Sequence, residues 1–536
     1  MRHHSVPPLL TLFLLPLGCA SESYMSRGQD ESADYADTGW AGAMEPNADE
    51  DGENSAPSDD DLGSEQESDF LKLLPALTDI FVFVANPARN TLTRIGVPSL
   101  DVITVDVGVE PDQVVTTSDY SKAISYNKGS DDLSIVDAET LDVYSVPVLN
   151  NLNSMVVSPD GVWAVVFHDA DIEDEGRSDG TQSFNELSVV NTETGQHFPM
   201  VVGRNPHQVK FTDDSTLALV VSDEKLALIN LATGSPERSI IEISDDLLDP
   251  PRAEELEITP DGAYAFIRQF NTADIKLVDL SSDEVTALPV AVNPTDLDLT
   301  PDGSEAVVVD RGAGQLWIYP TVNPETAIAE VIDLPENELI GSMQFSPDSS
   351  KAILYTTAAS VSHYTTWDLN EPDPAESLTV RPLVKPVKSV SITPNGGGLV
   401  VFHADDSGED SDPAYAGKHA LTLIDLDDFL DNPMILPGEP TAYAASSSGD
   451  VGYYIMEGEK TLTMVIFDAL LHQDIPLKSA PVHVGVLPDT HYAYVNQEHD
   501  LGRLTFYDPV NPLEAQDDVV KTITGFELNS ATEHHE

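Results

Sequence analysis

The 536-residue chain contains a single cysteine, Cys19. No disulfide can form within the chain, and the sequence supplies neither a cysteine-rich zinc site nor a c-type haem attachment. Beyond the first nineteen residues no stretch offers about 18 consecutive apolar residues, so the sequence predicts no transmembrane helix. The nucleophile elbow G-x-S-x-G, the H-E-x-x-H pair, the phosphate loop and the dinucleotide fingerprint are also missing. These absences favour a protein that is not an enzyme.

Basic residues are scarce. The chain has 25 Lys and Arg against 93 Asp and Glu, a formal net charge of −68. Residues 70–536 alone carry 77 acids against 23 bases, so the folded part is acidic in its own right. Such a surface repels phosphate backbones, and no nucleic-acid partner is expected. It suits solubility at high salt or the binding of divalent cations.

The start of the chain resembles an export signal. A weakly basic beginning precedes the apolar run Val6–Gly18, which is too short to span a bilayer. The run ends Leu-Pro-Leu-Gly-Cys19, which resembles a bacterial lipobox, although the proline departs from the usual pattern. The resemblance implies removal of residues 1–18 and lipidation of Cys19, which would anchor the exported protein to a bacterial membrane, at the outer membrane or the cell surface. The alternative is ordinary secretion with cleavage after Ala20.

Three segments follow from this resemblance and from composition. Residues 1–18 are the predicted lipoprotein signal peptide. Residues 19–69 are rich in Ser, Asp, Glu, Gly and Ala and cannot bury enough apolar surface to offset ordering entropy, so they predict a disordered acidic tether. Residues 70–536 are predicted to form one folded domain.

A short polar turn recurs nine times at intervals of about 41 to 54 residues, the period of propeller blades. Two examples are Thr259-Pro260-Asp261-Gly262 and Thr300-Pro301-Asp302-Gly303. Each turn precedes an apolar strand such as Tyr264–Ile267 and then an alternating strand such as Ile275–Leu280. Period-2 alternation and β-branched residues predict strands throughout the domain. The sequence therefore predicts an all-β propeller of four-stranded blades.

Two segments resemble the YVTN-type β-propeller repeat, which also occurs in lactonase-like propellers. Phe81–Asn86, followed by Asn90-Thr91-Leu92, is similar to the first strand and loop of that repeat, and Leu133–Thr140 is similar to a later strand. The resemblance covers about residues 79–526 and implies the propeller fold. It does not select a function, because such propellers serve binding, structural and enzymatic roles alike.

Counting the strands that follow each turn gives ten units, above the four to eight blades of most propellers. They begin near residues 80, 123, 163, 217, 264, 306, 351, 399, 452 and 491. The alternative is a conventional seven- or eight-bladed ring with extra strands. A ring must close, because an open end leaves an unpaired strand edge. Residues 70–78 or 526–528 are the candidates for a closing strand.

Two units, five apart, carry long acidic insertions after the second strand of the unit, and both insertions follow the sequence Val-Val-Phe-His. Carboxylates are hard oxygen donors that suit Ca²⁺, and His with Asp can hold a transition metal. The candidate metal ligands are His168, Asp169, Asp171, His403, Asp405 and Asp406. Their equivalent places in the repeat predict that both insertions leave the same face, on opposite sides of the ring. The alternative is two solvated acidic loops.

The loops that enter the innermost strands carry prolines, which preset the chain for a strand. These loops are expected on the same face as the acidic insertions. The side chains predicted to lie near the central funnel are His207, Lys388, His483 and His499.

Taken together, these features predict a surface-tethered, monomeric binding or scaffold protein of the bacterial envelope. Its partner would be a peptide, a glycan or another envelope protein. The alternatives are a lactonase-like hydrolase assisted by a divalent metal and a purely structural envelope protein.

Overall fold

The computed structural model describes residues 75–169, 172, 185–222, 224–244, 251–335, 338–408, 410–488, 490, 492–509, 520–526 and 532–534. Within these ranges the regular secondary structure is almost entirely β-strand. The predicted signal peptide, Cys19 and the acidic tether lie outside the described residues and remain predictions. Nowhere in the described ranges does a helix have the length and apolar character needed to cross a membrane.

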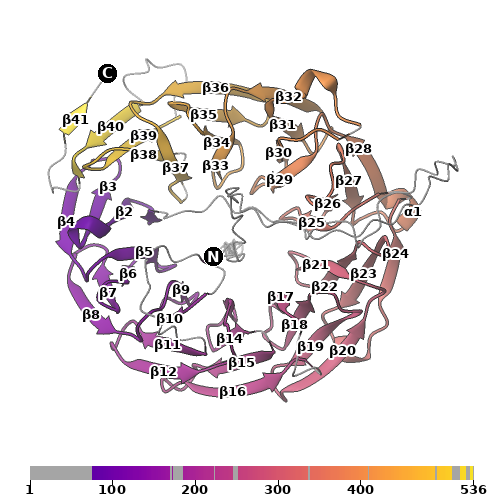
Figure 1. Ribbon diagram of the computed structural model, residues 1–536, viewed down its shortest axis with the longest axis horizontal. Coiled ribbons are helices and arrows are strands. Elements are labelled where there is room, and N and C mark those ends of the chain that lie inside the picture. Colours follow the sequence, from indigo (N-terminus) through magenta and orange to yellow (C-terminus); the bar gives the residue numbers. More distant parts are fainter. Residues whose placement is uncertain are drawn as a thin grey trace, which may run out of the picture.

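The strands form ten antiparallel sheets of four consecutive strands, and the tenth sheet has a fifth strand. Figure 1 shows these sheets in sequence order around a central axis, with the indigo first blade beside the yellow last blade. The protein is therefore a ten-bladed β-propeller. The ten repeat units predicted from the sequence are confirmed, and the alternative of a seven- or eight-bladed ring is wrong.

Each blade contributes one strand to each of four concentric rings. The innermost strands are β1 (Ala76–Leu77), β5 (Pro111–Thr116), β9 (Ser154–Val157), β13 (Gln208–Phe211), β17 (Ala253–Ile258), β21 (Pro294–Leu299), β25 (Ser342–Phe345), β29 (Val387–Ile392), β33 (Pro440–Ala445) and β37 (Pro481–Val486). The second strands are β2 (Phe81–Asn86), β6 (Lys122–Asn127), β10 (Trp163–Phe167), β14 (Leu217–Val221), β18 (Tyr264–Gln269), β22 (Glu305–Asp310), β26 (Lys351–Tyr355), β30 (Gly398–His403), β34 (Val451–Met456) and β38 (Ala493–Gln497).

The two outer rings follow the same order. The third strands are β3 (Thr91–Gly96), β7 (Asp132–Asp137), β11 (Glu186–Asn191), β15 (Lys225–Asn230), β19 (Asp274–Asp279), β23 (Gln315–Pro320), β27 (His363–Asp368), β31 (His419–Asp425), β35 (Thr461–Ile466) and β39 (Arg503–Tyr507). The outermost strands are β4 (Val102–Asp106), β8 (Val143–Pro147), β12 (His197–Val201), β16 (Glu237–Glu242), β20 (Glu284–Pro289), β24 (Glu330–Asp333), β28 (Leu378–Pro382), β32 (Asp431–Leu436), β36 (Leu471–Pro476) and β40 (Val520–Thr524), with β41 (Thr532–His534) beyond β40. The short helices are the 3-10 turns η2 (Pro87–Arg89), η3 (Pro324–Thr326) and η4 (Pro413–Tyr415) and the single-turn α1 (Pro374–Ser377).

The hydrophobic core lies between neighbouring blades. Strands of the second ring are buried on both faces, as in Trp163–Phe167, where all five residues are buried. Outermost strands such as β8 are mostly exposed. One cluster joins Leu219 of the fourth blade to Ala265 and Ile267 of the fifth, and similar clusters join other neighbouring blades. The second strands therefore read as continuous apolar runs, because each is covered on both sides by another sheet.

The recurring polar turn connects the innermost strand of a blade to its second strand. In the fifth blade the Thr259 hydroxyl donates to the Asp261 carboxylate at 2.6 Å and accepts from the Tyr264 N–H at 3.0 Å. Gly262 follows with φ of +66°, the left-handed region that glycine adopts at no steric cost. Six further blades repeat the geometry. Their hydroxyl residues are Thr117, Ser158, Thr212, Thr300, Ser346 and Thr393. In the ninth blade the Ser446 hydroxyl donates instead to Asp450, four residues on.

The ring closes by side-chain packing between the first and tenth blades. Residues 76–77 form the innermost strand of the first blade, but no described sheet combines strands from both ends of the chain. Instead Val82 and Ile95 of the first blade share a buried cluster with Phe506, Ile523 and Phe526 of the last. Of the two candidates for a closing strand, residues 70–78 supply β1 (Ala76–Leu77), the innermost strand of the first blade, while residues 527–528 lie outside the described residues. Burial of apolar surface then joins the first blade to the last without a shared ladder.

Candidate functional site

The loops that join second to third strands and the loops that lead into each innermost strand leave the propeller on one side, which we call the entry face. Six innermost strands begin there with a β-bulge, in which the first and third residues pair with the second strand and the residue between them is skipped. A bulge re-aims the skipped side chain. The six bulge residues are all at least partly exposed: Asp112, Glu254, Thr295, Lys388, Thr441 and Val482.

The last residue of the second strand faces the start of the innermost strand, and we call this place the anchor position. Pairing puts six buried residues there: Asn127, Gln269, Asp310, His403, Met456 and Gln497. Polar anchors hold the loop that enters the blade. Asp310 accepts a hydrogen bond from the N–H of Val292 at 2.7 Å, and Gln497 accepts one from the N–H of Ser479 at 3.1 Å.

His403 is the anchor of the eighth blade, and both nitrogens of its ring form hydrogen bonds within that blade. Nδ1 lies 2.9 Å from the carbonyl oxygen of Lys385, and Nε2 lies 2.7 Å from the hydroxyl of Thr422. Burial lowers the pKa of His403 to about 4, so the ring is neutral at pH 7. One ring nitrogen then donates to the carbonyl, and the other accepts from the hydroxyl.

His168 stands at the same place in the third blade. It follows Phe167, which pairs with Ser154, and it is buried. The next residue, Asp169, is also buried, and its backbone exchanges two hydrogen bonds of 2.7 and 2.8 Å with the side chain of Asn153. The shared Val-Val-Phe-His sequence therefore marks one structural position of the repeat.

The structure does not bring the predicted metal ligands of the two blades together. The third and eighth blades lie on opposite sides of the ring (Figure 1), and Asp171 lies outside the described residues. Asp405 Oδ1 lies 2.9 Å from His419 Nδ1, and Asp406 accepts a hydrogen bond from the Ser360 hydroxyl. In the described ranges, no three His, Cys, Asp or Glu side chains are grouped so that they could hold a metal ion.

Two of the predicted funnel residues join neighbouring blades. His207 is buried, with Nε2 2.7 Å from the carbonyl oxygen of Ala253 in the next blade and Nδ1 3.0 Å from that of Asn205. Lys388 is a bulge residue whose ammonium group pairs with Glu439, ahead of the next innermost strand, and 34% of its side chain is exposed. Both residues connect consecutive blades at the entry face.

The other two funnel residues belong to the tenth blade. His483 is buried against the ring of Tyr494, with 5.8 Å between ring centroids, and burial lowers its pKa to about 4. His499 lies in the loop between β38 and β39, where its Nδ1 accepts a hydrogen bond from the Leu501 N–H at 3.1 Å. One histidine thus packs within a blade, and the other shapes a turn.

The innermost strands carry a group of carboxylates that the sequence motifs did not single out. We define the acidic sector as Glu254, Glu255 and Glu257 of β17 with Asp296 and Asp298 of β21. A signal is present in the sequence, because acidic residues alternate with leucines just before two consecutive polar turns. The turns predict the blades. The acidic residues on the strands before these turns form a cluster only because the two strands lie side by side in the folded ring.

Two basic side chains lie among these acids. The guanidinium of Arg268 donates to Glu254 and Glu255 at 2.7 Å each, and the Lys210 ammonium lies 2.6 Å from Glu257. Burial raises the pKa of Glu257, and Lys210 opposes that shift. Arg268 also donates to the carbonyl of Pro294 at 3.1 Å, so this cluster joins the fifth and sixth blades.

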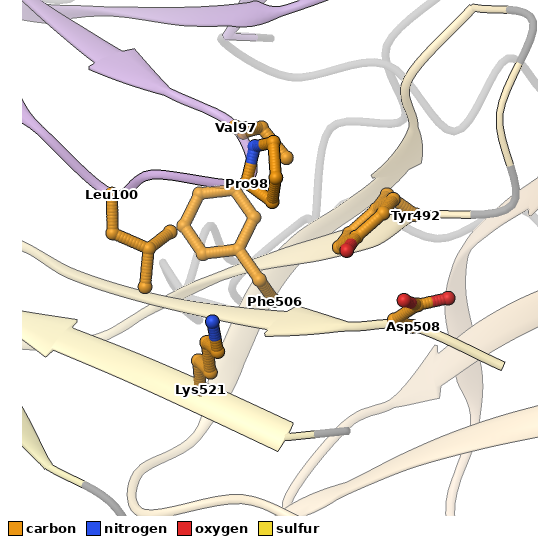
Figure 2. A pocket seen from close by; sticks show the side chains of 7 residues that line it. All are labelled: Val97, Pro98, Leu100, Tyr492, Phe506, Asp508 and Lys521. Carbon is orange, nitrogen blue, oxygen red and sulfur yellow. The ribbon is translucent and has the colours of Figure 1, made fainter. Parts of the chain in front are cut away.

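A cavity marks the closure of the ring. Figure 2 shows the turn after β3 beside the ring of Phe506, with two charged side chains and a tyrosine around the opening. The lining residues are Val97, Pro98, Leu100, Tyr492, Phe506, Asp508 and Lys521. Burial, with the neighbouring Asp508, raises the pKa of Tyr492 to about 12, so its phenol stays protonated. Four of the seven lining residues belong to the apolar cluster between the first and tenth blades or pack against it, so the cavity is a feature of blade packing.

Comparison with known proteins adds little to these observations. The sequence matches no established protein-family profile and no curated protein, so the likeness to the YVTN-type repeat remains a prediction. Among solved structures, a chain described as Kuenenia stuttgartiensis hydrazine synthase is 15% identical, covers 62% of this chain and 95% of its own length, and has a TM-score of 0.35.

Two further structures are similar at the same level. A eukaryotic initiation factor is 12% identical over 73% of this chain and 95% of its own, with a TM-score of 0.49. The dihydro-heme d1 dehydrogenase NirN in complex with DHE is 13% identical over 74% and 72%, with a TM-score of 0.40. Scores this low support no inference about function. The strand pairing of the chain itself defines its class, a ten-bladed β-propeller with bulged innermost strands and an acidic sector.

Proposed function

We propose that this protein is a binding protein whose entry face accepts a positively charged segment of a partner protein. The acidic sector is the observation that carries the proposal. Five carboxylates stand on two neighbouring innermost strands, and three of them, Glu254, Glu255 and Glu257, share only two basic side chains, Lys210 and Arg268. The sector therefore keeps an excess of negative charge.

Its three glutamates are partly exposed, whereas Asp296 is buried and accepts a hydrogen bond from the Met343 N–H at 2.5 Å. Strands β17 and β21 are in contact, and the side chains of Glu254, Glu255 and Glu257 are 30, 23 and 23% exposed. Partial enclosure by protein lowers the local dielectric and strengthens attraction for a cation.

Apolar side chains nearby suit lysine and arginine. Phe270 begins the loop after β18 and is 49% exposed, and Val292 lies in the loop leading into β21 and is 55% exposed. Such surface accepts the aliphatic stems of basic side chains, and the phenylalanine ring can take a cation over its face. This combination favours a basic peptide segment over a small inorganic cation.

The histidines of the entry face support the same conclusion. His403 holds a loop within its blade, and His207 bonds to the backbone of the next blade. These contacts make the entry face rigid, which lowers the entropic cost of binding a partner. The hydrolase alternative would require these same rings to serve a reaction.

Fluorescence anisotropy with a labelled lysine-rich peptide tests the proposal. The double variant Glu254→Gln/Glu257→Gln should bind it more weakly, by about 0.5 to 1 kcal/mol for each part-exposed charge removed, which is about five- to thirtyfold in Kd. Binding should also weaken as NaCl rises, because exposed charges are screened.

The matched control is Glu284→Gln/Glu330→Gln, which removes two exposed acids from outermost strands of the same two blades. It should bind as the wild type does. Equal weakening in both double variants would mean that the peptide responds only to net charge and would refute the site. Equal binding of a peptide with glutamine in place of lysine would refute the charge basis, and competition by spermine at equal concentration would point to a polyamine ligand instead.

A further inference from the structure

The acidic insertion of the eighth blade folds onto the seventh blade. The N–H of Asp412 donates to the carbonyl of Val384 at 3.0 Å, and the Asp410 carboxylate accepts from the N–H of Ser362 at 2.9 Å. The hydroxyls of Ser411 and Ser362 lie 2.7 Å apart. Three consecutive residues, 410–412, thus bond to the seventh blade and its exit, and we call them the clasp.

A histidine of the seventh blade lies between two carboxylates at this contact. His363 is the first residue of β27, and 21% of its side chain is exposed. Its Nε2 lies 2.6 Å from Glu338 Oε2, and its Nδ1 lies 3.4 Å from Asp410 Oδ2. Glu338 comes from the connection that leads into β25, whereas Asp410 belongs to the clasp. In the part of the chain that the structure describes, Glu338 and Asp410 are the charged groups that interact with the His363 ring.

We propose that the clasp is a proton-controlled contact, closed when the His363 imidazolium bridges Glu338 and Asp410 and released when that proton is lost. Only the imidazolium can donate from both ring nitrogens at once. A neutral imidazole donates one hydrogen bond to one carboxylate, and the lone pair of its other nitrogen then faces the second carboxylate. The two acids, drawn from different blades, would then repel each other across the ring.

The direction of the pH dependence follows from the two sites. The pKa of His363 is raised, first by its hydrogen bond to Glu338. The stabilisation that its imidazolium gives to the clasp is therefore fully present below the ordinary pKa of histidine, and it is lost as the pH rises through the raised pKa. The pKa of Asp410 is lowered despite burial, because the Ser362 N–H and His363 stabilise its carboxylate. Its contribution is lost only as pH falls through that lowered value. The clasp is therefore closed at mildly acidic pH and opens above neutrality.

The base of the insertion is held by separate contacts. Lys385 is fully buried, and its ammonium donates to the carbonyls of Asp405 at 3.1 Å and Lys418 at 2.7 Å. Asp406 accepts from the Ser360 hydroxyl. Neither contact involves His363, so loss of its proton should free the clasp while the base of the insertion stays in place. Release of the clasp would then change the border of the entry face next to the bulge residue Lys388. This release does not depend on the binding of a basic partner.

Amide hydrogen exchange measured by NMR or mass spectrometry tests this inference on the full chain. Protection factors, corrected for the intrinsic effect of pH, should fall several-fold for Ser362 and Asp412 between pH 5.5 and pH 8.5, while those of the fifth blade stay constant. In His363→Gln, which cannot carry the charge, protection at pH 5.5 should already equal the wild-type level at pH 8.5. Unchanged wild-type protection over this range would overturn the proposal.

Two variants separate charge from structure. His363→Lys keeps a positive charge at pH 8.5 and should retain protection of the clasp there. His419→Gln removes a second partly exposed histidine of this region, which faces the carboxylate of Asp405, and should leave the pH dependence of the clasp intact. A pH dependence that survives in His363→Gln, or disappears in His419→Gln, would assign the effect to another group and refute the role of His363.

Discussion

At the scale of single residues, a carboxylate or amide two places after the hydroxyl organises seven of the polar turns in the described ranges. In the sixth blade Asp302 accepts hydrogen bonds from the Ser304 N–H at 3.0 Å and from the Thr300 hydroxyl at 2.7 Å. The pKa of Asp302 is lowered, first by the backbone bond from Ser304. The eighth blade uses Asn395 at the same place, where its side-chain oxygen accepts from Thr393 at 2.7 Å. The turn therefore needs an acceptor with this geometry, and it does not need a charge.

Replacing Asp302 should separate the contribution of its hydrogen bonds to stability from the contribution of its charge. Asp302→Ala should lower the free energy of unfolding by about 1 kcal/mol, the scale of lost hydrogen bonds. The pKa of Asp302 is lowered in the folded state. The stability that its ionised carboxylate contributes is therefore present above the ordinary pKa of aspartate, and it is lost as the pH falls through the lowered pKa. The gap in melting temperature between wild type and Asp302→Ala should thus narrow in acid. Asp302→Asn, which copies the residue of the eighth blade, should keep the turn and show no such narrowing; a gap independent of pH for Asp302→Ala would contradict this account.

At the scale of strands and blades, one repeated plan serves different local purposes. The anchor position holds an entry loop through Asp310, Gln497 or His403, and the bulge position sends a side chain toward the rim. The seam between the first and tenth blades follows the same plan, because an apolar cluster joins its two blades without a shared ladder, as between other neighbouring blades. Gly502 illustrates how close that packing is. Its φ is +76°, and a Cβ atom there would lie 2.4 Å from the ring of Phe526.

Removing the aromatic ring at the seam should open the propeller at that point. Phe526 is 1% exposed, and Phe526→Ala should cost about 3 to 5 kcal/mol, as for other buried aromatic side chains. Hydrogen exchange should speed up first in β2 and β39, which face each other across the seam. Phe402→Ala, an equally buried residue of the eighth blade, is the control and should speed exchange in its own blade instead. Uniform acceleration in both variants would mean that the seam is no weaker than any other blade contact.

At the scale of the whole molecule, charge opposes compactness. Residues 70–536 carry 77 acids and 23 bases, so the folded ring repels itself over its whole surface. Much of this repulsion acts between exposed groups, which salt screens over about 10 Å at 0.1 M and about 3 Å at 1 M. The protein should therefore be more stable at high ionic strength than at low.

Raising NaCl from about 0.05 to about 1 M should increase the melting temperature, since the Debye length shortens over this range. A chain of similar fold but balanced charge should show a smaller change. CaCl₂ at matched ionic strength tests the metal hypothesis in the same experiment: a rise beyond that of NaCl, reversed by EDTA, would indicate a specific site. A melting temperature that falls with NaCl would show that self-repulsion is not a limiting term.

Much of the fold was predictable from local sequence. The hydroxyl-x-Asp turns, the apolar second strands and the alternating third strands are dictated by backbone hydrogen bonding and by burial between sheets, and they recur often enough to give ten blades. Sequence also placed both insertions on one face, because each joins a second strand to a third. Their opposite positions on the ring followed from counting blades.

The roles of particular side chains depended on contacts between distant parts of the chain. His403 and His168 resembled metal ligands in the sequence, but strand pairing put His403 at the anchor position, and His168 directly follows the last paired residue of the equivalent strand. Lys210 and Glu257 are separated by many residues, and only the packing of the fourth blade against the fifth brings them together.

Sequence by itself thus determined the unit and the number of repeats, because both follow from local hydrogen bonding and from the burial of each strand. Tertiary structure decided how the ring closes and which charges meet. His363 became a bridge only when an insertion from the next blade laid Asp410 against it, 47 positions further along the chain. The interaction of two charges depends on their distance and on the dielectric between them, and neither is encoded in the spacing of residues along a strand.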